Sequence, residues 1–86
     1  MIKDNDPAST KRIESTRRIH RRAAQMCQAK GVSDEELAVA AIYFAFDLAE
    51  AYAGPGMVAI EWLRTSIDVL EQGVLNGVRR PDAKPN

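Results

Sequence analysis

The 86-residue chain has one cysteine, no net charge and no long uncharged hydrophobic run. A disulfide needs two cysteines, so Cys27 cannot form one within the chain. Neither a secretory signal nor an uncharged apolar run of 18 residues is present, and we therefore expect a reduced, cytoplasmic, soluble protein. A chain of this length suits one domain and buries only roughly 60 to 65% of the surface that its unfolded form exposes.

Groups that perform chemistry are also scarce. His20 and Cys27 share a helix face but lie about 10.5 Å apart along the axis, and no third or fourth ligand stands near them, whereas the ligands of zinc must converge. We therefore expect no metal site, no cofactor and no catalytic residue.

Two D-x-x-E pairs, Asp47 with Glu50 and Asp68 with Glu71, resemble the carboxylate clusters of all-α nucleotide pyrophosphohydrolases, which bind magnesium. If the chain turns near Pro55, the first pair lies roughly 7 to 12 Å and the second roughly 19 to 24 Å from the turn. The pairs would then miss one another within a chain, and only an antiparallel dimer could join them. We expect no enzyme, with a magnesium-dependent hydrolase as the remote alternative.

Helix signals divide the chain into three segments, and no strand hairpin is indicated. Asp6 and Pro7 suit the N-cap and first position of a helix, since proline lacks only an N–H that would be unpaired there. This helix is predicted to start at Pro7 or Thr10 and to end near Lys30, because Gly31 can adopt the left-handed conformation that terminates helices.

The second helix has the clearest start signal in the sequence. Ser33 and Glu36 have the spacing of a capping box, and Val32 and Leu37 occupy the positions of a hydrophobic staple. The helix is predicted to run to Ala53, where the sequence "GPG" breaks it.

A third helix follows the GPG break. It is predicted to begin at Pro55 or Met57 and to end at Leu75 or Asn76, with Gly77 as its stop. Ile60, Leu63, Ile67, Leu70 and Val74 alternate in steps of three and four, which is typical of a seam that packs helix on helix. A second apolar set points away from that seam: Val58, Trp62 and Val69.

Residues 37–53 are apolar around nearly the whole helix, with Asp47 and Glu50 as the only charges. The first helix offers only a thin apolar stripe to cover them. Burial of each uncovered Phe or Leu side chain would stabilise the protein by about 1 to 3 kcal/mol. A second chain can cover these side chains, so we expect a homodimer or higher oligomer. The alternative is a monomeric bundle of three helices packed closely through alanines.

The predicted fold is therefore all-α. We expect one helical domain over residues 1–86 with frayed tails at 1–6 and 77–86, in which a basic first helix precedes an antiparallel hairpin of helices 2 and 3 and dimerisation completes the domain. The expected self-association or partner interface comprises Phe44, Phe46, Leu48, Ile60, Trp62, Leu63, Ile67, Leu70 and Val74.

Basic residues are concentrated in the first helix. Residues 1–30 carry eight Lys or Arg against three Asp or Glu, whereas residues 31–86 carry four against nine. We name one set of them the basic band: Lys11, Arg12, Arg17, Arg18, Arg21 and Arg22. The band could be a solvated face that docks on the acidic lines of the other helices, a surface for an acidic protein, or a nucleic-acid contact through phosphates.

A helix-turn-helix interpretation of the region around Gly31 fails on charge. The helix that would enter the major groove begins with Asp34, Glu35 and Glu36 and continues almost wholly apolar. A recognition helix needs donors at base edges and no negative charge against the DNA backbone.

From the apolar excess of the second and third helices we expect a small cytoplasmic regulatory or adaptor protein that acts by protein–protein interaction, for example by sequestering a transcription factor or an enzyme subunit. The alternative is a nucleic-acid binder that uses the basic band.

Overall fold

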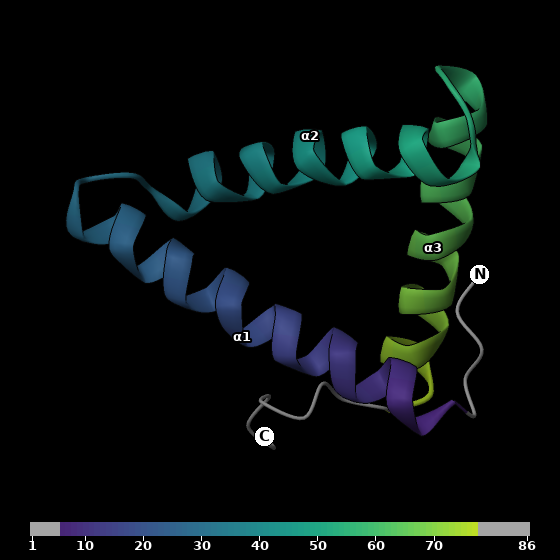
Figure 1. Cartoon of the computed structure of the whole chain (residues 1–86), viewed down its shortest axis with the longest axis horizontal. Coiled ribbons are helices and arrows are strands. Elements are labelled where there is room, and N and C mark those ends of the chain that lie inside the picture. The colour runs from purple at the N-terminus through teal and green to yellow at the C-terminus, as the bar shows by residue number, and fades with distance from the viewer. Residues whose placement is uncertain (1–5, 78–86) are drawn as a thin grey trace. The chain divides into compact units, whose positions relative to one another are not determined.

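The computed structural model describes residues 6–77, which form three helices and no strand. α1 spans Pro7–Ala29, α2 spans Asp34–Ala53 and α3 spans Met57–Leu75 (Figure 1). The predicted all-α class and the three helices are confirmed. The predicted tails at 1–6 and 77–86 fall, except for Asp6 and Gly77, outside the described residues.

Short-range hydrogen bonds fix the ends of α1 where the sequence predicts them. The Asp6 carboxylate accepts from the backbone N–H groups of Ala8 at 3.1 Å and Ser9 at 3.3 Å. At the other end Gly31 has φ +95°, a conformation that a residue with a Cβ adopts only at a cost. The loop to α2 therefore needs glycine at that position.

The predicted capping box starts α2. The Ser33 hydroxyl oxygen accepts from the Glu36 N–H at 3.1 Å, and the Glu36 carboxylate accepts from the Ser33 N–H at 2.9 Å. The bond from the Ser33 backbone, followed by that from the Ser33 side chain, holds the pKa of the Glu36 carboxyl below its ordinary value. The side chain of Gln28 also bonds to the Asp34 carboxylate at 2.6 Å, which ties the end of α1 to the start of α2.

Two glycines with positive φ make the break between α2 and α3. Gly54 has φ +136° and Gly56 has φ +59°. The Gly56 N–H donates to the Glu50 carboxylate at 2.9 Å, so a side chain of α2 closes the loop that leads into α3. A Cβ on Gly54 would lie 3.1 Å from a methyl carbon of Val58, which makes this glycine necessary for both its conformation and its close contact.

The chain forms two compact units, residues 1–43 and 44–86. The antiparallel hairpin and the dimer stay predictions.

No single helix among the described residues is long and apolar enough to span a membrane. α2 and α3 taken together have the length and composition of a span, but the chain bends by 111° at the break between them.

Very little of either unit is buried. In the second unit Ala49 is 2% exposed and Ala59 is fully enclosed, and these two alanines are the only buried residues in the described part of the chain. In the first unit the most protected apolar residues, among them Ile13, Cys27 and Leu37, are only half-buried. The helices therefore leave most of their large apolar side chains outside any core.

Candidate interaction surfaces

The second unit presents ten large apolar side chains to solvent. All ten are at least 50% exposed: Phe44, Leu48, Tyr52, Met57, Val58, Ile67, Val69, Leu70, Val74 and Leu75. Monomeric soluble proteins seldom expose contiguous apolar patches larger than about 300 to 600 Å². Ten exposed large apolar side chains on two short helices make the second unit a candidate binding surface.

On α2 the exposed large apolar residues of the second unit form a row along one side of the helix. Phe44, Leu48 and Tyr52 follow one another at intervals of four and lie within about 80° of each other around the helix. We call these three residues the outer row. About 100° around the helix from this row lie Ala45, Ala49 and Ala53, which are half-buried or buried, and their small side chains let another helix approach closely. α2 thus carries a row of small, covered residues beside a row of large, exposed apolar ones.

On α3 the buried side is turned slightly away from the apolar seam that the sequence shows. Ala59 is buried and Trp62, Leu63 and Ser66 are half-buried, and the Trp62 ring meets the Tyr52 ring edge to face at 5.7 Å. The indole N–H of Trp62 is enclosed and finds no hydrogen-bond partner among the described residues. The first turns of α3 therefore pack through small residues and one tryptophan.

The remaining turns of α3 leave the seam open. We call Ile60, Leu63, Ile67, Leu70 and Val74 the α3 seam. Its first two members are half-buried, whereas Ile67, Leu70 and Val74 are 62%, 60% and 70% exposed. The seam is thus continuous along one helix face, and only its first turn is partly covered.

The nine predicted interface residues divide into two sets. Phe46, Ile60, Trp62 and Leu63 are half-buried, and the other five are exposed: Phe44, Leu48, Ile67, Leu70 and Val74. The exposed five lie on the outer row and the α3 seam, which belong to different helices. The half-buried four are partly covered, and one of them, Trp62, meets the Tyr52 ring.

The basic band lies on α1 in the first unit. Lys11, Arg12, Arg18, Arg21 and Arg22 are exposed and Arg17 is half-buried. The Arg18 guanidinium donates to the Ser15 hydroxyl at 3.3 Å, and Glu14 is the only acidic residue within α1. The band is therefore a strongly positive helix surface.

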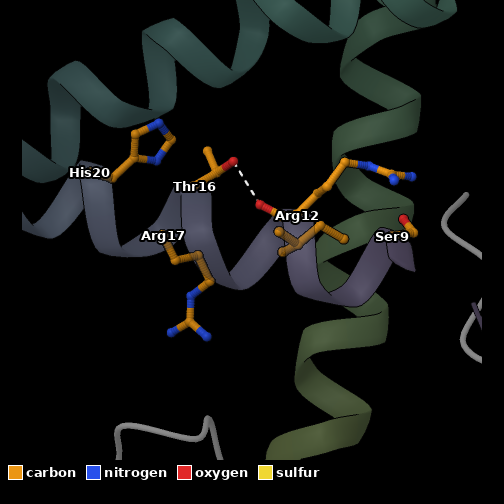
Figure 2. Close-up of a pocket in the computed structure, with 6 residues that line it drawn as sticks. Ser9, Arg12, Thr16, Arg17 and His20 are labelled. Atoms are coloured by element: carbon orange, nitrogen blue, oxygen red, sulfur yellow. Dashed lines mark hydrogen bonds between the residues drawn. The ribbon is translucent and has the colours of Figure 1, made fainter. Parts of the chain in front are cut away.

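An open groove of about 320 Å³ runs along α1, and all of its lining residues belong to that helix (Figure 2). Figure 2 shows the side chains of Arg12, Thr16 and His20 on one side of the α1 ribbon and the side chain of Arg17 on the other side. The Thr16 hydroxyl donates to the Arg12 carbonyl at 2.8 Å, which occupies that hydroxyl within the helix. With a floor made by one helix, the groove is a surface feature and not an enclosed ligand site.

The carboxylate pairs do not assemble into a metal site. Among residues 6–77 no group of three or more His, Cys, Asp or Glu side chains could hold a metal ion. Glu50 bonds to the Gly56 N–H, so one member of the first pair has a structural task that the D-x-x-E pattern did not indicate. The sequence feature that could have indicated this role is the position of Glu50 just before the GPG break.

Sequence reasoning also missed the charges beside the α3 seam. Arg64 and Glu71 are seven residues apart and border the same edge of the seam. The Arg64 guanidinium donates to Glu61 at 3.0 Å, in an ion pair whose side chains are 65% and 64% exposed. The heptad register of the seam, extended to its flanking positions, could have found this edge.

Neither a protein-family model, nor a curated protein, nor a solved structure matches this chain.

Proposed function

We propose that this protein is a small regulatory or adaptor protein that acts by binding other protein chains through the apolar surface of α2 and α3. The observation that carries the proposal is the mismatch between a core of two alanines and ten exposed large apolar side chains in the second unit. A partner that covers those side chains supplies the burial that the unit lacks.

The energy at stake is large for a chain of this size. Covering the exposed half of a Leu or Phe side chain contributes about 1 kcal/mol, so ten such side chains amount to about 10 kcal/mol. A small domain is stable by only about 5 to 15 kcal/mol in total. Association through this surface would therefore stabilise the protein by an amount comparable to its own folding.

The partners that fit such a surface are another copy of the chain and a second protein with an apolar groove or helix. An exposed apolar helix face lies in a groove through side chains spaced at three and four residues, and both the outer row and the α3 seam have that spacing. A cytoplasmic setting and a role in sequestering a transcription factor or an enzyme subunit are part of the proposal.

Nucleic-acid binding is the second candidate, and the basic band supports it. Five of its six side chains are exposed along one helix, and such a set can neutralise phosphates without reading sequence. Its affinity would fall steeply with salt, whereas apolar association would not.

The test uses the full chain as bait in three forms: wild type, Phe44→Asp/Leu48→Asp, and Arg17→Gln/Arg18→Gln/Arg21→Gln/Arg22→Gln. Both substituted apolar residues are about half exposed, so the fold should survive, and circular dichroism checks this. The proposal expects a protein partner that the first variant loses and the arginine variant keeps, in low and high salt. Binding that only the arginine variant loses, together with recovered nucleic acid, would contradict it.

A further inference from the structure

We propose that the α3 seam binds the α3 seam of a second copy in antiparallel orientation, about a two-fold axis that passes between Ile67 and Leu70. The inference rests on the proposed function, because it names the partner and the geometry for one part of the apolar surface. It leaves the outer row of α2 to another protein, so both partners can be held at once.

The first step is the shape of the seam. Its five residues occupy the a and d positions of a heptad. In an antiparallel pair such positions meet in layers of a against d, which sets Ile67 opposite Leu70 of the second copy and Leu63 opposite Val74. Both layers occur twice across the two-fold axis, so the seam is complementary to itself.

The second step is the charge at the edge of the seam. Arg64 and Glu71 both occupy e positions, and in this antiparallel register Arg64 of each copy comes within about 3 Å, measured along the axis, of Glu71 of the other. Two attractive pairs result. In a parallel pair the edge contacts join g to e positions, which sets Ser66 against Glu71 and Ala59 against Arg64 and forms no ion pair.

The third step is the edge on the other side. Ala59 and Ser66 occupy g positions and are buried and half-buried, so this is the covered side of α3. The e edge is open, since Arg64 and Glu71 are exposed. A second copy can therefore reach the seam from the side that carries the complementary charges.

The area indicates a weak dimer. Ile67, Leu70 and Val74 are each 60 to 70% exposed and offer roughly 100 Å² apiece. Two copies would bury on the order of 600 Å² from these side chains, with more from the flanking residues. Because interfaces below about 1,200 Å² are typical of transient complexes, we expect a dimer whose population depends on concentration.

One experiment reads the orientation directly. Single-cysteine variants Leu63→Cys and Val74→Cys are made in a Cys27→Ser background and oxidised mildly, separately and as a mixture. In the antiparallel dimer two copies of position 63 lie about 16 Å apart along the axis, whereas positions 63 and 74 meet. The proposal therefore expects disulfide-linked dimer from the mixture and little from either variant alone.

A charge exchange gives a second reading that does not depend on cysteine. Sedimentation equilibrium compares wild type with Arg64→Glu, Glu71→Arg and the double variant at low salt, with circular dichroism to check helicity. Each single change replaces two attractive pairs by two repulsive ones and should weaken dimerisation by about tenfold, and the double variant should restore it.

Each contrary outcome has a definite meaning. Cross-linking of Leu63→Cys alone, or a double charge variant no better than the single ones, would overturn the antiparallel pairing while leaving the proposed function intact. A monomer at every concentration would overturn the pairing as well. The proposed function falls separately, when Phe44→Asp/Leu48→Asp keeps every protein partner.

Discussion

Replacement of the fully enclosed Ala59 by leucine should destabilise the second unit strongly. Leucine adds three carbon atoms at a position with no exposed surface. Overpacking of this kind costs about 1 to 3 kcal/mol. For a domain of this size each kcal/mol lowers the melting temperature by about 4 to 8 °C, so we expect Ala59→Leu to melt roughly 4 to 24 °C below wild type.

The matched control is Ala40→Leu on α2. Ala40 is exposed, leucine is nearly as good a helix former as alanine, and the change should alter the free energy of unfolding by less than about 0.5 kcal/mol. Thermal and urea unfolding followed by circular dichroism, each at two protein concentrations, measures both variants. Equal stability of the two leucine variants would refute the close packing of α3 at Ala59.

Three further predictions concern loops and caps. Gly54→Ala should lower the free energy of unfolding by at least about 1 kcal/mol, because its φ of +136° and the nearby Val58 methyl oppose a Cβ. The control Gly73→Ala, at an open helical site, should raise the free energy of unfolding by up to about 1 kcal/mol. If urea unfolding showed Gly54→Ala to be stabilising and Gly73→Ala to be destabilising, this account of the GPG break would be contradicted. Ser33→Ala should cost about 1 kcal/mol by loss of the N-cap. Because the pKa of Glu36 is lowered in the folded chain, its contribution to stability is present above its unfolded pKa and is lost as the pH falls through the folded pKa; acid titration followed by circular dichroism should therefore show a smaller loss of stability in Glu36→Gln than in wild type, and equal losses would count against the capping box.

The sequence predicted helix ends well because each end depends on a few neighbouring residues. Ser33 with Glu36, and the glycines at 31 and 54, act within one turn of chain, so their residue types are enough to identify the signal. The predicted start at Ser33 and the end at Ala53 agree with the structure.

Which face of α3 is covered could not be predicted in the same way. Hydrophobic periodicity points to the α3 seam, whereas the buried face centres on Ala59, with Ser66 half-buried along it. Small residues allow close approach of two helices but carry little hydrophobic signal, so a pattern of apolar residues overlooks them. The seam was found by periodicity, and its exposure came only from the structure.

The roles of the charged residues could also be predicted only in part from the sequence. The basic band was evident from composition, because six Lys or Arg residues stand within twelve positions. The role of Glu50 at the Gly56 N–H depends on how the chain turns at the GPG break, and a pattern of spaced carboxylates gave it a different meaning. Arg64 and Glu71 gain significance only once the open edge of the seam is known.

The central structural claim is that this chain associates with a second copy of itself through an apolar helix surface, and its native mass tests that most directly. Light scattering coupled to size exclusion should be run over a series of protein concentrations at low salt and at 1 M salt. The account predicts a mass that rises from 9.5 kDa toward twice that value with concentration and does so in both salts, since salt screens charges but not apolar burial. A mass of 9.5 kDa at every concentration, or a dimer that 1 M salt abolishes, would contradict it.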